Sequence, residues 1–305
     1  MQLIANNIAI EAEDHGDPAD PAILLIMGFG AQLLLWPDEL VEALVAKGFR
    51  VVRFDNRDIG LSHKFEGEKA PHPLWHLFSK KVLRREKMAP YTLEDMADDA
   101  IGVLDALGIE RAHVMGASMG GMIAQIVGAN YPDRVLSLIP VMTSTNNPKL
   151  PGPKKEIRAM LFRAARNRPT DKEEAVAAGT DFFTAIGGSA GSERQEIKQL
   201  ARQIVERSFY PEGPPRQMAA IIDTGDLRPW TRRITAPTLV IHGADDPLIL
   251  PAGGEDVARN IEGAQLEVIE GMGHDLPPSL IPKMAEIVAT HCRAHGPAAG
   301  EKSAA

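Results

Sequence analysis

Residues Ala112 to Gly121 read Ala-His-Val-Met-Gly-Ala-Ser-Met-Gly-Gly. The apolar run 112–115 predicts a short buried strand, and residues 119–130 predict a helix. Between them, Gly116 to Gly120 fit the pattern G-x-S-x-G, which places a serine on a sharp turn between a strand and a helix. Glycines suit such a turn because the strand and the start of the helix come close together. The stretch therefore predicts Ser118 as an exposed nucleophile.

Short apolar runs alternate with helical patterns on both sides of this turn. The predicted strands cover residues 22–27, 50–55, 112–115, 135–139, 238–241 and 265–269, and the predicted helices cover 38–47, 92–107, 119–130 and about 279–291. This order predicts an α/β fold, with a mostly parallel central sheet and helices on both of its faces. Residues 2–5 and 8–13, joined at Asn6-Asn7, predict an antiparallel hairpin at the start of the sheet.

The pattern changes between the strands at 135–139 and 238–241. Residues 147–230 are helical, charged and interrupted by prolines, and we interpret them as a helical cap inserted into the sheet. The core is then expected to comprise residues 1–146 and 231–295. The tail, 296–305, is small and polar with nothing to bury, and is predicted to be flexible.

The composition excludes several classes of protein. With 33 Lys and Arg against 41 Asp and Glu, the formal charge of the 305-residue chain is −8, which argues against a nucleic-acid-binding surface. The most apolar stretch, 22–36, contains Gly28 and Gly30 and is shorter than the roughly 20 residues of a membrane span. The lone cysteine, Cys292, and the absence of a basic, apolar leader at the N-terminus favour a cytoplasmic protein.

A second G-x-S-x-G pattern occurs at Gly187-Gly188-Ser189-Ala190-Gly191. With ten serines and 27 glycines in 305 residues, chance alone gives about 0.08 matches, so a second match is unexpected. Ser189, however, follows no predicted strand and precedes a polar run typical of a helix cap. We therefore expect Ser189 to lie in a loop and Ser118 to be the nucleophile.

A serine hydroxyl needs a base, and the base needs a carboxylate that orients it. Among nine histidines, His274 stands in a glycine-rich loop directly after the strand 265–269, at the edge of the sheet where catalytic groups collect. Asp245 and Asp246 follow the strand 238–241 at the same edge, and only one of them can meet His274. The order serine, acid, histidine is that of the α/β-hydrolase arrangement.

Two backbone amides are predicted to stabilise the oxyanion that forms during acyl transfer. Met119 supplies one amide because it follows the nucleophile at a helix start. The loop after the first long strand, which contains Gly28, Phe29 and Gly30, is expected to supply the second amide from Phe29. The glycines allow the backbone to approach the substrate closely.

The chain resembles the α/β-hydrolase superfamily along nearly its whole length, and within it the capped serine esterases related to aclacinomycin methylesterase. The resemblance rests on Gly16-Asp17-Pro18, residues 23–30, Trp36-Pro37-Asp38-Glu39, Asp55-Asn56-Arg57, and residues 116–121, 237–247 and 271–274. It implies an α/β-hydrolase fold in which Ser118 is the nucleophile, His274 the base, and Phe29 and Met119 the oxyanion donors. It also selects Asp246 as the acid, because the family's acid stands three residues after the glycine that ends the strand. Met27-Gly28, where many relatives have His-Gly, and Arg57–Ser62 depart from the family pattern.

These observations predict a carboxylesterase-type serine hydrolase that needs no cofactor or metal and acts on small to medium apolar esters. Gly28, Gly30, Met272 and two apolar residues of the cap, Phe183 and Met218, are the expected substrate contacts. Hydrolysis of amides, prolyl peptides or C–C bonds, and perhydrolysis, stay open as alternatives on the same site, as does a non-catalytic ligand receptor.

Overall fold

The computed structural model describes residues 1–72, 75–76, 79 and 88–296, and its centre is an eight-stranded sheet. The strand order is β1-β2-β4-β3-β5-β6-β7-β8. The hairpin β1–β2 and the pair β2–β4 are antiparallel, and every later pair is parallel. The predicted α/β fold with a mostly parallel sheet is therefore confirmed. The expected flexible tail lies outside the described residues except for Gly296.

The elements follow the predicted alternation closely. The strands are β1 Gln2–Ala5, β2 Ile8–His15, β3 Ala22–Ile26, β4 Arg50–Phe54, β5 Ala112–Ala117, β6 Val135–Val141, β7 Leu239–Gly243 and β8 Gln265–Ile269. The helices are α1 Asp38–Val45, α3 Leu93–Ala106, α4 Met119–Asn130, α5 Lys155–Arg166, α6 Lys172–Ile186, α7 Arg194–Arg207, α8 Gly213–Thr224, α9 Arg228–Thr231, α10 Ala252–Asn260 and α11 Ile281–Ala294. Short 3-10 turns cover Leu33–Leu35, Pro132–Arg134 and Pro278–Leu280.

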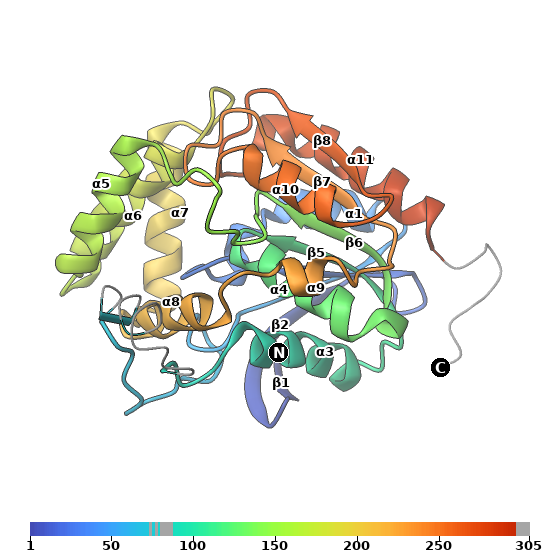
Figure 1. The fold of residues 1–305 in the computed structure, drawn as a ribbon, viewed down its shortest axis with the longest axis horizontal. Coiled ribbons are helices and arrows are strands. Elements are labelled where there is room, and N and C mark those ends of the chain that lie inside the picture. Colours follow the sequence, from blue (N-terminus) through green and yellow to red (C-terminus); the bar gives the residue numbers. More distant parts are fainter. Residues whose placement is uncertain (73–74, 77–78, 80–87, 297–305) are drawn as a thin grey trace.

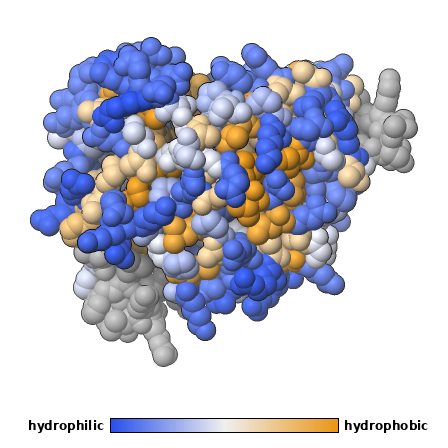
Figure 2. All heavy atoms as spheres, turned by 90° about the horizontal axis from the view of Figure 1, so that it is seen from above, coloured by the Kyte–Doolittle hydropathy of each residue, from blue (hydrophilic) through white to orange (hydrophobic). Residues whose placement is uncertain are grey.

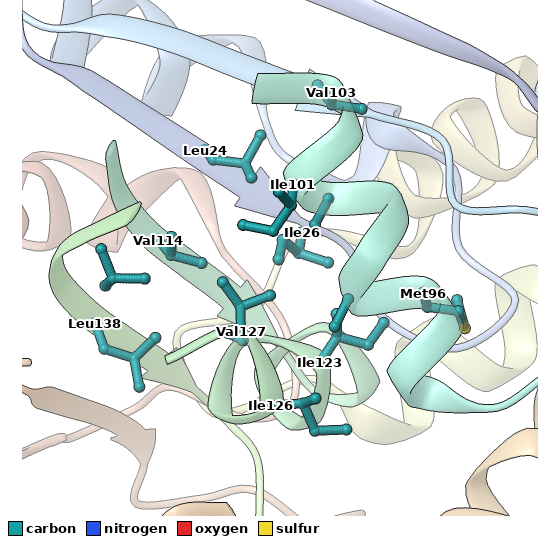
Figure 3. Close-up of a cluster of buried hydrophobic side chains, with 14 of the residues drawn as sticks. Leu24, Ile26, Met96, Ile101, Val103, Val114, Ile123, Ile126, Val127 and Leu138 are labelled. Carbon is teal, nitrogen blue, oxygen red and sulfur yellow. The ribbon is translucent and has the colours of Figure 1, made fainter. Parts of the chain in front are cut away.

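The central strands are buried on both faces because their side chains alternate between two hydrophobic clusters. On one face, Leu24 and Ile26 of β3 pack with residues of α3 and α4, such as Met96 and Ile123 (Figure 3). On the other face, Ile23 and Leu25 belong to the cluster formed with α1 and α11. Continuous burial explains why these strands are apolar throughout rather than alternating with polar residues.

The predicted hairpin at the start of the chain is confirmed. Asn6 and Asn7 have φ values of 46° and 63°, the left-handed conformation that a two-residue hairpin turn requires and that Asn tolerates. Their strands pair from Gln2↔Glu11 to Ala5↔Ile8. The last predicted helix starts two residues later than expected and extends to Ala294.

Helices α5 to α8, here called the insertion helices, lie between β6 and β7 in the sequence. Figure 1 shows α5, α6 and α7 side by side at one end of the molecule. Val176 of α6 and Ala201 and Val205 of α7 form a small hydrophobic cluster of their own. Val141 at the end of β6 pairs with Ile241 of β7, so the insertion leaves the sheet and returns to it between adjacent strands.

The face seen in Figure 2 is largely hydrophilic towards its edges, with apolar side chains gathered near its middle. In the part of the chain that the structure describes, the large hydrophobic side chains that are exposed are those of Met1, Ile4, Phe29, Leu61, Trp75, Phe162 and Val268. Among the described residues, no helix is both long and apolar enough to cross a membrane.

Candidate active site

Ser118 stands on a tight turn between β5 and α4. Its φ and ψ angles are 56° and −118°, a positive φ that is uncommon for a residue with a side chain. A Cβ atom on Gly116 would lie 2.2 Å from the carbonyl oxygen of Gly120, and one on Gly120 would lie 2.0 Å from that of Ile26. Both positions therefore require glycine, because β5, the start of α4 and β3 are in direct backbone contact.

The backbone of Ser118 is fully hydrogen-bonded, which stabilises this conformation. Its N–H donates to the carbonyl of Val141 at 2.9 Å, and its carbonyl accepts from the Thr143 hydroxyl at 2.6 Å. Gly28 lies beside the side chain, because a Cβ built on Gly28 would be 3.6 Å from Ser118 Oγ. The serine is half-buried and lines the large cavity described below.

His274 and Asp246 form a hydrogen-bonded pair at the same edge of the sheet. The distance from His274 Nδ1 to Asp246 Oδ2 is 2.8 Å. The other carboxylate oxygen, Oδ1, accepts the backbone N–H groups of Leu248 and Ile249, both at 2.9 Å. The two oxygens thus have separate functions: one holds the carboxylate in place and the other faces the imidazole.

The surroundings of Asp246 keep it ionised. Burial alone would raise the pKa of the carboxyl, but the neighbouring His274 and hydrogen bonds from His242 and His274 outweigh burial and hold the pKa below its usual range. His242 lies 3.5 Å from Asp246 Oδ2 through Nε2, and the same nitrogen lies 2.7 Å from the carbonyl oxygen of Ile249. An ionised carboxylate is the partner that an imidazole needs when it accepts a proton at its other nitrogen.

Asp245, the alternative acid, makes different contacts. Its Oδ2 accepts hydrogen bonds from the Ser189 hydroxyl at 2.6 Å and from the Ser189 N–H at 3.0 Å. These bonds lower the pKa of Asp245. The second G-x-S-x-G pattern is therefore placed in the loop between α6 and α7, and the N-cap of α7 is Glu193 rather than Ser189.

The two predicted oxyanion donors flank Ser118. Met119 is the first residue of α4, and Phe29 follows Gly28 in the loop after β3. In the described part of the chain, neither amide N–H is hydrogen-bonded to a protein acceptor. Phe29 is 38% exposed and lines the cavity. The residue whose amide N–H has no protein acceptor is therefore open to the cavity.

The loop that carries Phe29 is held from both sides. The Asn56 side-chain amide donates to the Met27 carbonyl at 2.7 Å. On the other side, Gln217 Oε1 of α8 accepts the Gly30 N–H at 2.8 Å. Gln217 is itself fully buried and donates to the carbonyl of Arg57 at 3.1 Å.

A cavity of about 1320 Å³ lies between the sheet edge and the insertion helices. From the core it is lined by Gly28, Phe29, Gly30, Ser118, Met119 and His274, and from the insertion mostly by apolar side chains, among them Met160, Leu161, Phe182, Phe183, Ile186 and Met218. Small-molecule sites commonly measure roughly 300–1,000 Å³. The cavity therefore accommodates a bulky, mainly apolar molecule.

One expected substrate contact is wrong. Gly28, Gly30, Phe183 and Met218 line the cavity, but Met272 does not. Its side chain is fully buried in the cluster that α1 and α11 form against the sheet. Met272 faces the core, whereas His274, two residues further along the same loop, lines the cavity.

Ion pairs that the sequence does not reveal attach the insertion helices to the turn after β4. Asp55 accepts from Arg207 of α7 at 2.6 Å, and Asp58 accepts two hydrogen bonds from Arg216 of α8 at 2.8 and 2.7 Å. Both carboxylates are fully buried. No local signal could have revealed these pairs, because each joins residues about 150 positions apart.

The fold is that of an α/β hydrolase. Residues 21–278 match the family described as alpha/beta hydrolase fold, and the chain belongs to that family. Over the part of the chain that the structure describes, no group of three or more His, Cys, Asp or Glu side chains is arranged to hold a metal ion.

Named relatives narrow the classification of the chain to esterase-type hydrolases. It is 28% identical over 320 residues to rhodomycin D methylesterase DauP of Streptomyces sp. strain C5, covering 96% of this chain and 97% of that protein. It is 26% identical to 3-oxoadipate enol-lactonase 2 of Acinetobacter baylyi, covering 88% and 87%. The crystal structure of the enol-lactonase from Burkholderia xenovorans LB400 superposes with a TM-score of 0.73 at 26% identity, covering 96% of this chain and all of that one.

Proposed function

We propose that this chain is a serine carboxylic-ester hydrolase in which Ser118 is the nucleophile, His274 the base and Asp246 the acid. The observation that carries the proposal is the 2.8 Å contact between His274 and Asp246 in a loop that lines the same cavity as Ser118. The strained turn at Ser118 supports it. Such a turn projects the serine side chain beyond the edge of the sheet, and a serine with only a structural role would not require this unfavourable backbone conformation.

The reaction follows from these positions. His274 takes the hydroxyl proton of Ser118 as the oxygen attacks the ester carbonyl, and the amides of Phe29 and Met119 donate to the oxyanion. The protonated imidazole then gives its proton to the leaving alcohol, and an acyl-enzyme remains. Water, activated by His274, releases the acid and restores Ser118. Asp246 holds the imidazole with its free nitrogen available for these transfers.

The substrate we propose is an ester of a bulky, apolar acid with a small alcohol. A cavity of about 1320 Å³ is larger than a short-chain ester needs. The small to medium esters expected from the sequence are therefore at the lower end of the range of substrate sizes that we propose. The relative DauP is named for a methylesterase activity on rhodomycin D, which fits the same division into a large acyl group and a small alcohol.

The insertion, residues 147–230, serves in this proposal as a cap that roofs the pocket. Its helices supply a large part of the apolar lining, including Phe183 and Met218, while the proposed catalytic groups come from the sheet edge. A roof excludes water and strengthens the electrostatic interactions beneath it.

Labelling with a fluorophosphonate, followed by peptide mapping, tests the proposal. We expect modification at Ser118 alone, loss of labelling in Ser118→Ala, and normal labelling in Ser192→Ala, which changes another serine of the cavity lining. Label on Ser189, or unchanged ester hydrolysis by Ser118→Ala, would refute the assignment.

A substrate panel separates ester hydrolysis from its nearest alternative. The enol-lactonase relatives favour lactones as a second substrate class for the same residues. Methyl esters of graded acyl size, lactones, anilides and prolyl peptides should be compared at equal enzyme concentration. We expect the highest kcat/KM on the bulkiest methyl ester.

A further inference from the structure

The loop between α6 and α7, residues 187–191, packs directly against the loop that carries His274. Two backbone hydrogen bonds hold the histidine loop here: the His274 N–H donates at 2.8 Å to the carbonyl of Ile186, the last residue of α6, and the Ala190 N–H of the 187–191 loop donates to the Gly271 carbonyl at 2.9 Å. The backbone N–H of the candidate base is therefore bonded to the insertion.

The two loops are so close that glycine is needed on both sides. A Cβ atom on Gly188 would lie 2.1 Å from the Gly271 carbonyl oxygen and 2.4 Å from the Gly273 nitrogen. Conversely, a Cβ atom on Gly273 would lie 2.3 Å from the Gly188 nitrogen. These are backbone neighbours, which cannot move aside as a flexible side chain would.

Side chains extend the contact to the residues next to the acid and to the base. Ser189 bonds through its hydroxyl and its N–H to Asp245, the neighbour of Asp246. Asp275, the neighbour of His274, accepts the N–H groups of Gly273 at 3.0 Å and Gly188 at 3.4 Å. One loop of the insertion thus touches residues adjacent to the base and to the acid.

We infer that residues 187–191 are a positioning element for His274, and that Gly188 and Ser189 act through the histidine loop without contact with substrate. The inference rests on the roles proposed above for His274 and Asp246. It also accounts for the second G-x-S-x-G pattern: its glycines allow close backbone packing, and its serine caps a carboxylate. A displacement of the insertion from the core would break the bond at the His274 N–H, so the pocket roof and the base are mechanically linked.

The central test is Gly188→Ala, with Gly179→Ala of α6 as its matched control. A methyl group at 188 has to displace the 271–273 backbone, whereas one at 179 would meet Ala201 Cβ at 3.6 Å, an ordinary contact. We expect Gly188→Ala to lower kcat and the fluorophosphonate labelling rate of Ser118 about tenfold or more with little change in KM, because misplacing a catalytic group by about 1 Å is that costly. Gly179→Ala should retain both rates.

A second pair of variants decides the matter if Gly188→Ala fails to fold. Ser189→Ala removes the hydroxyl bonded to Asp245, and Ser189→Thr keeps one. We expect a severalfold fall in kcat for the alanine variant and recovery for the threonine variant, at equal melting temperatures. Unchanged kcat and labelling in the folded variants, or losses that only follow melting temperature, would overturn the inference. Failure of the wild-type protein to label at Ser118 would instead refute the proposed function.

Discussion

Replacing Asp246 by asparagine tests the mechanism at the atom level, because the two carboxylate oxygens have different partners. Asparagine has one oxygen and one NH₂ group. The oxygen is required at the Oδ1 position, where the N–H groups of Leu248 and Ile249 both donate. The opposite orientation would set the NH₂ group against these two partly buried N–H donors, at a cost of up to about 1–3 kcal/mol for each unsatisfied group.

The NH₂ group therefore faces His274 and donates to its Nδ1. An imidazole that accepts at Nδ1 carries its proton on Nε2 and cannot take the proton of Ser118. We expect kcat to fall by about four orders of magnitude, or about 5 kcal/mol of activation free energy. Asp245→Asn is the matched control: its amide oxygen can still accept from Ser189, so its kcat should stay within about threefold.

The measurement is kcat on 4-nitrophenyl acetate, with the active fraction determined by fluorophosphonate titration so that traces of wild-type protein do not set the result. Circular dichroism and melting temperature show whether each variant is folded. If folded Asp246→Asn kept more than about one per cent of kcat, the tautomer argument would be refuted. A larger loss in Asp245→Asn than in Asp246→Asn would show that the acid has been misassigned.

Three further outcomes can be checked. Phe183→Ala or Met218→Ala, which shortens a side chain of the pocket roof, should lower kcat/KM about tenfold or more for bulky esters and much less for acetate esters, since a lost pocket contact is worth about 1–3 kcal/mol. Equal losses on all esters would show that these residues only support the fold. Arg216→Met leaves the buried Asp58 carboxylate without the guanidinium that pairs with it, and should reduce the free energy of unfolding by about 3–5 kcal/mol, or Tm by about 5–8 °C for 305 residues. Adding Asp58→Asn to this variant should restore part of the lost stability. Burial, with His291 and His295 nearby, lowers the pKa of His113 from 6.5 to about 3. Between these two pH values only the unfolded state binds a proton at this histidine, so the free energy of unfolding falls with pH, by at most about 1.4 kcal/mol per pH unit. The stability of His113→Asn to urea should therefore depend less steeply on pH, and an unchanged slope would contradict this explanation.

The parts of the site that depend on neighbouring residues in the chain could be predicted. The turn at Ser118 needs glycines two residues before and after it, and those contacts are made within one strand–helix unit and with β3. The loops of Asp246 and His274 follow strands directly, so the direction of a parallel sheet is enough to bring them to one edge. Met272 shows the limit of this reasoning, because closeness in sequence to His274 does not determine which way a loop residue faces.

The attachments of the insertion could not be predicted, because they depend on packing between distant segments. Arg207 and Arg216 look like ordinary charged positions on amphipathic helices, and only the fold brings them to buried carboxylates of the turn after β4. The sequence predicts a loop at the second G-x-S-x-G pattern but not its partner, because the loop that it contacts lies more than 80 residues further along the chain.

Two contacts of the insertion connect the substrate specificity of the pocket to its chemistry. The insertion bonds to the oxyanion loop through Gln217 and Gly30, and to the histidine loop through Ile186 and His274. Two parts of the proposed catalytic apparatus thus contact the segment that also contributes to the apolar roof. A bulky acyl group that fits beneath the roof without displacing it leaves both bonds intact, whereas one that forces the roof outward strains the oxyanion donor and the base together. Selection for acyl size in such a pocket acts on kcat as well as on binding.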